Sequence, residues 1–232
     1  MLLVRAADVP EYVQDGVVDC GITGADLVRE RGARVRELLR LGFGACRLEV
    51  AVPQESRWTA VDDLVHAAVA TAYPRLTREL LLDRGLEVQL VDVTGSVEVA
   101  PRLGLADAIV DLVSSGSTLR TNGLRSLGTL FESEAVLVGR DDGAEQLTSL
   151  LRSVVDARAH RYLMLNAPET ALEEVCGIVG GARAPSVLPL AEPGMVAVHA
   201  LVAAADVWRL LPELEEAGAS SILLVPVERM VA

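Results

Sequence analysis

The chain has 232 residues, of which 51% are hydrophobic and 23% charged, and this composition predicts a soluble globular protein with ample core material. Its formal net charge of −12 argues against a wide nucleic-acid-binding surface. There is no apolar run of about twenty residues, and no apolar region follows Met1-Leu-Leu-Val-Arg5, so neither a membrane span nor a signal peptide is expected. The expected compartment is therefore the cytoplasm.

The first 140 residues alternate between short apolar runs and helical patterns. The runs that predict strands are 1–4, 17–22, 47–53, 67–73, 87–93, 106–110 and 134–138. The patterns that predict helices are 9–13, 27–31, 59–64, 75–84 and 96–103. Residues 67–73 are almost uniformly apolar, which is typical of a parallel strand buried on both faces. The β-α-β-α-β order predicts a parallel sheet with right-handed crossovers.

The pattern changes in the last third of the chain. A turn is expected at Asp141-Asp-Gly143, then a long helix over 146–161, and a break at Gly180-Gly181. The remaining expected elements are strands at 160–166, 186–190, 195–202 and 220–226, with helices at 168–179 and 206–217. Their order, βαββαβ, predicts a ferredoxin-like unit with an antiparallel four-stranded sheet.

One stretch carries the strongest chemical signal, Asp111-Leu-Val-Ser-Ser-Gly-Ser-Thr-Leu119, directly after the strand at 106–110. Gly116 allows close approach of the backbone, while Ser115, Ser117 and Thr118 add small hydrogen-bond donors. These features favour a turn that cradles a phosphate group. The alternative is a Ser/Thr-rich turn that only caps a helix.

Three further polar residues lie at comparable positions. Arg5 and Tyr73 each follow an expected strand, and Glu98 begins an expected helix after Gly95-Ser96. Open α/β sheets bind ligands at strand ends, so these residues and Asp111 could line one crevice. Asp111 could accept hydrogen bonds from ribose hydroxyls or hold Mg²⁺ through water, or it could simply cap the turn.

Conventional catalytic apparatus is not found in the sequence. His66, His160 and His199 are scattered, and no nucleophile elbow, zinc-protease helix or dinucleotide fingerprint is present. The three cysteines, Cys20, Cys46 and Cys176, are far apart and indicate neither a disulfide framework nor a zinc site.

Several segments together, in order along nearly the whole chain, resemble ATP phosphoribosyltransferase of the long form, which carries a C-terminal regulatory domain. The segments are Asp19-Cys-Gly-Ile-Thr-Gly24, Val69-Ala-Thr-Ala-Tyr-Pro74, Gly95-Ser-Val-Glu98, Leu105 to Leu119, Arg161-Tyr-Leu-Met-Leu-Asn-Ala-Pro168 and Gly218-Ala-Ser-Ser-Ile-Leu223. The resemblance implies an α/β fold whose two-lobed catalytic core is similar to periplasmic binding proteins. It implies lobes at 1–51 with 139–159 and at 52–138, and a regulatory domain at 160–232.

The resemblance also implies a reaction, the first step of histidine biosynthesis. N1 of ATP attacks C1 of 5-phosphoribosyl 1-pyrophosphate and releases pyrophosphate, with Mg²⁺ as cofactor, histidine as feedback inhibitor and a homo-oligomer, dimer or hexamer, as the assembly. Residues Ser114 to Thr118 and Leu119 would hold the 5′-phosphate, Asp111 the ribose hydroxyls, and Arg5, Tyr73 and Glu98 the cleft. No protein base or nucleophile is obligatory, since positioning and charge stabilisation dominate such a displacement.

The sequence departs from the family at its start. The family begins with roughly one more strand-helix-strand block, which carries an Asn-Lys-Gly segment, so the first lobe is expected to lack a strand and activity is an open question. The alternative function is a non-catalytic bilobal protein that binds small molecules or regulates. A further alternative is that residues 160–232 serve only for oligomerisation.

Overall fold

The computed structural model describes residues 1–140, 144–180 and 184–231. The chain divides into two compact units, Met1–Thr148 and Ser149–Ala232, and the division falls within one helix, α5 (Glu145–Arg158). The turn expected at 141–143 and Gly181 of the expected break lie outside the described residues. In the described part of the chain, no helix is long and apolar enough to cross a membrane.

The first sheet of unit 1 has three antiparallel strands in the order β1-β8-β2, and we call it and its helices lobe I. Its elements are η1 (Ala6–Asp8), α1 (Val9–Gln14), β1 (Cys20–Gly24), α2 (Ala25–Arg31), β2 (Arg36–Arg40) and β8 (Ala135–Gly139). Val9 and Val13 of α1 pack on Val136 and Val138 of the central strand. This small core holds α1 against the sheet.

The second sheet has five strands in the order β5-β4-β6-β3-β7, and we call it and its helices lobe II. Its strands are β3 (Cys46–Pro53), β4 (Ala68–Thr71), β5 (Gln89–Asp92), β6 (Ala108–Val113) and β7 (Leu124–Ser133). Its helices are η2 (Val61–Asp63), α3 (Pro74–Leu82), η3 (Val97–Val99) and α4 (Ser117–Thr121). Strands β5, β4 and β6 run parallel, as predicted, while β3 pairs antiparallel with β6 and β7.

Core side chains cover both faces of this sheet. Val110 of β6 shares a buried cluster with Leu76 of α3, whereas its neighbour Ile109 shares another with Val97 and Leu119 on the η3 and α4 side. Successive residues of a strand point to opposite faces, so β6 is buried on both sides. The strand β6 is thereby fixed rigidly beneath the loop that follows it.

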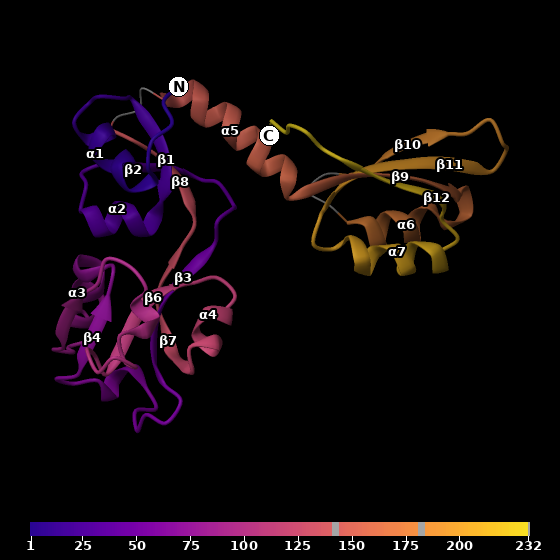
Figure 1. Ribbon diagram of the computed structural model, residues 1–232. Helices are drawn as coiled ribbons and strands as arrows, with labels where there is room; N and C mark the ends of the chain where they lie inside the picture. Colours follow the sequence, from indigo (N-terminus) through magenta and orange to yellow (C-terminus); the bar gives the residue numbers. More distant parts are fainter. Residues whose placement is uncertain (141–143, 181–183, 232) are drawn as a thin grey trace. The chain divides into compact units, whose positions relative to one another are not determined.

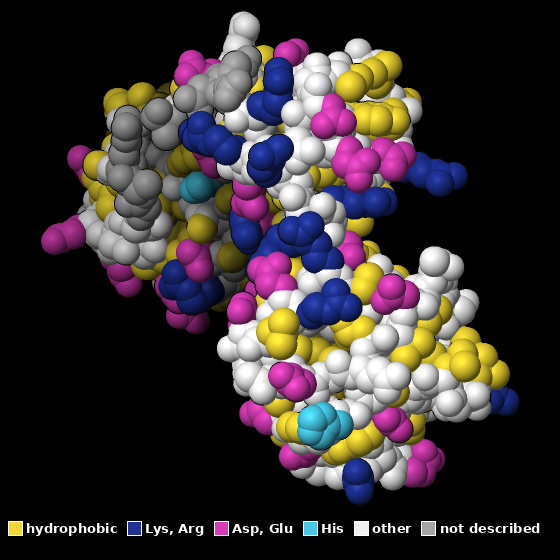
Figure 2. Space-filling model, turned by 90° about the vertical axis from the view of Figure 1, so that its left-hand side faces the viewer, with side chains coloured by type: hydrophobic (Ala, Val, Ile, Leu, Met, Phe, Trp, Pro, Cys, Tyr) yellow, Lys and Arg dark blue, Asp and Glu magenta, His cyan; other side chains and the backbone are white. Residues whose placement is uncertain are grey.

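The chain crosses between the two lobes twice, at residues 41–45 and at Glu134 (Figure 1). The expected lobe boundaries at 51/52 and 138/139 fall within β3 and β8, which belong to the second and first sheets respectively. Acidic and basic side chains gather where the lobes meet (Figure 2).

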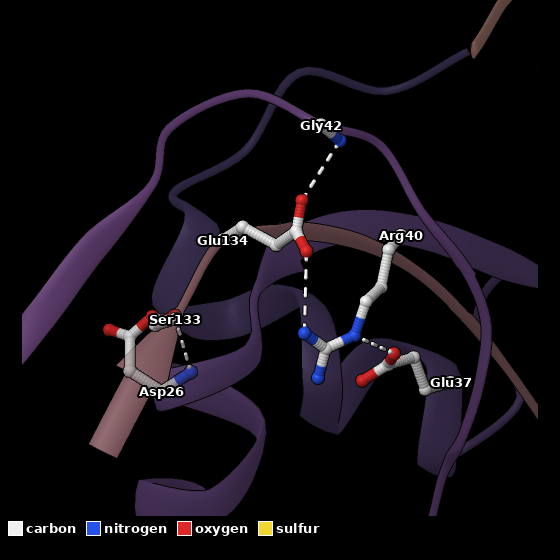
Figure 3. A network of polar contacts seen from close by, with 6 residues as sticks. All are labelled: Asp26, Glu37, Arg40, Gly42, Ser133 and Glu134. Atoms are coloured by element: carbon white, nitrogen blue, oxygen red, sulfur yellow. Dashed lines mark hydrogen bonds and ion pairs between the residues drawn. The ribbon is translucent and has the colours of Figure 1, made fainter. Parts of the chain in front are cut away.

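Glu134 ties the two crossings together (Figure 3). Its carboxylate accepts a hydrogen bond from the Gly42 backbone N–H at 2.9 Å and pairs with the Arg40 guanidinium at 3.3 Å. Arg40 also pairs with Glu37 at 2.9 Å. The two segments that join the lobes are therefore held to each other.

Unit 2 folds as the predicted βαββαβ arrangement, with strand order β10-β11-β9-β12 and every pairing antiparallel. Its elements are β9 (His160–Pro168), η5 (Glu169–Ala171), α6 (Leu172–Val179), β10 (Ser186–Pro189), β11 (Met195–Ala203), α7 (Val207–Glu216) and β12 (Ser220–Pro226). Helices α6 and α7 lie on one face of the sheet (Figure 1). Leu163, Leu165, Val175, Val198 and Leu214 are buried between the two layers.

Several local predictions were wrong. Residues 1–4, expected as a strand, are exposed and pair with no described strand, and an isolated strand has no partner for its backbone groups. The helices expected at 59–64 and 96–103 shrink to single 3₁₀ turns, and Pro101 interrupts the second. Strands β2 and β7 were not predicted.

Candidate functional site

The loop after β6 forms a small pocket of about 110 Å³, lined without interruption by Asp111 to Leu119. A water molecule takes up about 30 Å³ of liquid, so the pocket has room for a group of a few heavy atoms. Leu119 is buried and anchors α4 to the core, whereas the hydroxyls of Ser114, Ser115 and Ser117 are exposed. The loop therefore presents donors on a fixed base.

The turn of this loop depends on Gly116, whose φ of +72° lies in the left-handed region. The Ser115 and Ser117 hydroxyl oxygens lie 3.0 Å apart in a hydrogen bond. The Ser117 N–H donates to the Ser115 hydroxyl oxygen at 3.5 Å. Backbone N–H groups in the first turn of a helix have no partner within that helix, so those of Thr118 and Leu119 in α4 are available to an acceptor in the pocket. Small hydroxyls and free N–H groups together suit a phosphate oxygen.

Asp111 lies at the rim of the same pocket, with its carboxylate accepting the Leu112 backbone N–H at 2.8 Å. Burial raises the pKa of Asp111 above its ordinary value, and the negative charge of Glu98 raises it further, while the Leu112 hydrogen bond lowers it. The structure thus brings Glu98, from η3, within electrostatic range of Asp111. Two carboxylates beside a donor-rich loop suit a ligand that carries both hydroxyl and phosphate groups.

A second carboxylate lies buried on the neighbouring strand. Glu49 of β3 lies directly across from Asp111 in the sheet and is 6% exposed. Arg47 pairs with Glu49 at 2.7 Å through its Nε atom, which balances the buried charge. Like charges on facing strands destabilise a sheet unless they are compensated, so Arg47 stabilises this arrangement.

Tyr73 follows β4 and precedes α3, and the carboxylate of Asp26 in α2 lies near its hydroxyl. Burial raises the pKa of Tyr73 well above its ordinary value, and the charges of Asp26 and Asp111 add to the shift. The tyrosine therefore keeps its proton and acts as a hydrogen-bond donor. Because Asp26 comes from lobe I and Tyr73 from lobe II, this contact spans the two lobes.

Asp26 itself is 4% exposed and held from a second side. The Ser133 hydroxyl donates to its carboxylate, and its backbone N–H donates to the Ser133 oxygen at 3.0 Å (Figure 3). Asp26 and burial also raise the pKa of the Cys46 thiol, with burial the larger cause. The carboxylate of Asp26 is thus fixed beside Tyr73.

Of the residues predicted to line one crevice, Tyr73 and Glu98 each lie within electrostatic range of Asp111. Arg5 precedes η1 and is exposed, and within the described residues no hydrogen bond or ion pair of its side chain links it to them. Asp26 was not among the site residues predicted from the sequence. Its signal was available, since this acid lies two residues after the strand that ends at Gly24.

The fold and the site define a two-lobed α/β protein of the periplasmic-binding-protein type with a donor-rich loop at a strand end. A solved structure titled Tv2483 bound to L-arginine shares this fold, with a TM-score of 0.52 at 19% identity over 66% of this chain and 65% of that one. The ATP phosphoribosyl transferase (HisG:HisZ) complex from Thermotoga maritima has a TM-score of 0.58 at 28% identity over 67% of this chain and 79% of that one.

The sequence comparisons identify the family. Residues 5–157 match the family described as ATP phosphoribosyltransferase, and residues 157–229 match the HisG C-terminal domain. ATP phosphoribosyltransferase of Halobacterium salinarum is 44% identical over 100% of this chain and 84% of the relative, and that of Cytophaga hutchinsonii is 38% identical over 100% and 83%. The chain belongs to the ATP phosphoribosyltransferase family.

Proposed function

We propose that this chain condenses ATP with 5-phosphoribosyl 1-pyrophosphate to N1-(5-phosphoribosyl)-ATP and pyrophosphate, the first step of histidine biosynthesis. The observation that carries the proposal is the Asp111–Leu119 pocket, in a chain that matches the family along its whole length. A small pocket of hydroxyls and free N–H groups has the chemistry to bind the 5′-phosphate of the ribosyl donor.

The residues around this pocket take complementary roles in the proposal. Ser114, Ser115, Gly116, Ser117, Thr118 and Leu119 hold the phosphate. Asp111 accepts hydrogen bonds from the ribose hydroxyls. Tyr73 and Glu98, together with Arg5, line the cleft for the nucleotide, and Asp26 orients the Tyr73 hydroxyl.

The chemistry of the displacement fits a site without a strong base. A transition state with a developing positive charge at C1 depends on holding two substrates in line and on stabilising the departing pyrophosphate. The carboxylates of Asp111 and Glu98 place negative charge beside the ribose. Tyr73 keeps its proton because of its raised pKa, so it donates a hydrogen bond rather than accepting a proton.

The family uses a metal ion, and we infer that it is Mg²⁺. Asp111 and Glu98 are hard oxygen donors close to the phosphate-type loop, and two carboxylates with water and substrate phosphates are the donor set that Mg²⁺ prefers. These residues fit the ion and would hold it together with the substrate. When bound, it would supply positive charge to the leaving pyrophosphate.

We also infer that unit 2 binds histidine as a feedback inhibitor and that the protein is a cytoplasmic homo-oligomer, dimer or hexamer. The match of residues 157–229 to the HisG C-terminal domain supports a regulatory role. Titration of the oligomer with histidine in a calorimeter tests this directly. Heat of binding with inhibition is expected, whereas no heat from a folded oligomer would leave unit 2 as an oligomerisation domain.

The decisive experiment for the activity is a transferase assay with ATP, 5-phosphoribosyl 1-pyrophosphate and Mg²⁺, with product measured by chromatography. Ribose 5-phosphate binding is measured in parallel by calorimetry, because it reports the loop alone. Product formation is expected. A folded chain that binds ribose 5-phosphate but makes no product would contradict the transferase and favour a non-catalytic binding protein with the same bilobal fold.

A further inference from the structure

A helix of lobe I supplies the missing cap for a helix of lobe II. The Glu30 carboxylate of α2 accepts the backbone N–H of Arg75 at 3.2 Å and that of Leu76 at 2.8 Å, in the first turn of α3. The side chain of Tyr73, the N-cap residue of α3, makes no capping hydrogen bond, and Pro74 has no backbone N–H to donate. A carboxylate at this position accepts hydrogen bonds from two N–H groups that have no partner within the helix. Its negative charge also interacts favourably with the positive end of the helix dipole.

A side chain of α3 also contacts the C-terminal end of α2. The Arg75 guanidinium reaches back to the Arg31 carbonyl, at the end of α2, over 3.5 Å. Gly32 ends α2 with a φ of +60°, and a Cβ built there would lie 2.0 Å from the guanidinium carbon of Arg75. Each helix end thus receives a side chain of favourable charge from the other lobe.

A second pair of residues lies beside this contact. Arg29 of α2 pairs with Glu79 of α3, and its guanidinium lies 5.1 Å from the ring centre of Phe131. Both members of this ion pair are substantially exposed, so their contribution to the contact is small. Glu30 is therefore the main polar link between the two helices, because charged hydrogen bonds to backbone donors are the stronger kind.

The position of Glu30 connects this link to the candidate site. Asp26 and Glu30 are four residues apart on α2 and so share one face of the helix. Asp26 meets the Tyr73 hydroxyl, while Glu30 meets the backbone two and three residues after Tyr73. One helix face thus holds both the side chain of Tyr73 and the backbone on which it is mounted.

We propose that Glu30 is a positioning residue, an interlobe latch that holds α3 and Tyr73 against α2 when the two lobes are closed. This inference rests on the proposed function for the identity of the ligand, ATP, that the closed cleft binds. Loss of the latch shifts the lobes toward an open arrangement, and ligand binding must then supply the free energy of closure. The pocket proposed for ribose 5-phosphate is lined by Asp111 to Leu119 of lobe II alone, so we expect its binding not to depend on the latch.

The test uses Glu30→Ala and Glu30→Gln in the full chain, with Glu11→Ala as the matched control. Glu11 is also a glutamate of lobe I, exposed, 3.7 Å from Arg31, and forms no hydrogen bond or ion pair with α3 within the described residues. Amide hydrogen exchange at Arg75 and Leu76 is expected to accelerate in Glu30→Ala and to stay unchanged in the control. Melting temperatures show whether each variant is folded.

Calorimetric dissociation constants provide the functional readout. We expect the ATP dissociation constant to rise about tenfold in Glu30→Ala and about threefold in Glu30→Gln, which keeps one acceptor oxygen. Ribose 5-phosphate affinity is expected to match wild type in all variants. In the transferase assay, the KM for ATP should rise in the same proportion, with kcat within about twofold.

Two results would overturn the latch. One is wild-type exchange at both amides in Glu30→Ala, and the other is faster exchange with unchanged ATP affinity. An inactive wild-type chain would contradict the proposed catalysis alone, since exchange and ATP binding of the variants still decide the role of Glu30. If Glu30→Ala does not fold, the Glu30→Gln results decide in the same way.

Discussion

At the scale of single residues, two side chains of the candidate site lie in surroundings that disfavour their charged forms. Asp111 is half-buried near Glu98, and Tyr73 is half-buried against Asp26. Both arrangements raise the pKa of the group concerned, and such perturbed groups cluster at functional sites. Burial of the Asp111 charge lowers the stability of the folded chain, and this loss can be measured directly.

Asp111→Asn should stabilise the folded chain near neutral pH. The pKa of Asp111 is higher in the folded than in the unfolded state, so the folded state binds more protons in that window and stability falls as pH rises through it. The amide removes this penalty and still accepts the Leu112 N–H. We expect a higher melting temperature than wild type at about pH 7.5, and a gain that disappears near pH 4, where the carboxyl becomes protonated.

Asp107→Asn is the matched control for this measurement. Asp107 precedes the same strand, and its carboxylate also accepts a backbone N–H, from Ala68 at 2.9 Å, but it is exposed. We expect no pH-dependent gain of this kind for it. An equal gain for Asp111→Asn at both pH values would show that charge burial is not the cause.

Tyr73→Phe removes only the hydroxyl that bridges the lobes. Asp26, which is 4% exposed, then loses the polar hydroxyl that lies beside its carboxylate, so the buried charge is less well satisfied. We expect kcat/KM for ATP to fall about tenfold or more, with ribose 5-phosphate affinity unchanged. Unaltered kinetics with ATP would remove Tyr73 from the proposed cleft.

At the scale of elements, the site depends on a loop whose two ends are anchored in the core. Strand β6 is buried on both faces, and Leu119 ties α4 to one of them. Only the hydroxyl-rich turn between them is free to meet a ligand. The geometry of that turn requires one left-handed residue, Gly116.

Gly116→Ala should weaken ribose 5-phosphate binding about tenfold, because a Cβ is strained at this φ and distorts the turn by which the donors converge. The new Cβ would also lie 3.4 Å from the Arg120 guanidinium. Gly104→Ala is the control, since its φ of +70° is equally unfavourable but nothing lies within 4 Å of its Cβ. Both variants should lose similar stability, and calorimetry should show weaker binding for Gly116→Ala alone. Equal ribose 5-phosphate affinities in the two variants would show that the turn at Gly116 does not take part in phosphate binding.

At the scale of the whole molecule, two units with separate cores share one chain. Leu76 belongs to a cluster of unit 1 and Leu214 to the cluster of unit 2, and each is fully buried. No residue is common to the two clusters. The chain should therefore unfold in two steps that can be perturbed one at a time.

Leu76→Ala and Leu214→Ala form a matched pair for scanning calorimetry. Each leaves a cavity in one core, and each should destabilise its own unit by about 2–5 kcal/mol. We expect the first to lower only the transition of unit 1 and the second only that of unit 2. A single transition that moves equally in both variants would mean that the two units unfold cooperatively.

Predictions from the sequence were right where burial stabilises an element and wrong where the element depends on pairing with a distant strand. Strands β3, β4 and β6 and the unit-2 arrangement were confirmed because their apolar periodicity reflects burial directly. Strand β7 was missed because its residues are mostly half-buried and its register slips twice against β3, which blurs the alternation. The strand expected at 1–4 failed because periodicity cannot report the absence of a pairing partner.

The sequence by itself determined the fold class, the loop at Asp111–Leu119 and the family, since these depend on local patterns and on the order of motifs along the chain. Only the tertiary structure decided which lobe each strand joins, that Glu98 comes within electrostatic range of Asp111, and that Asp26 and Glu30 of one lobe hold Tyr73 and α3 of the other. The contacts between the lobes join residues about 45 positions apart or more, as between Glu30 and Arg75. Their formation depends on the packing of two separate sheets, which no periodicity within either segment records.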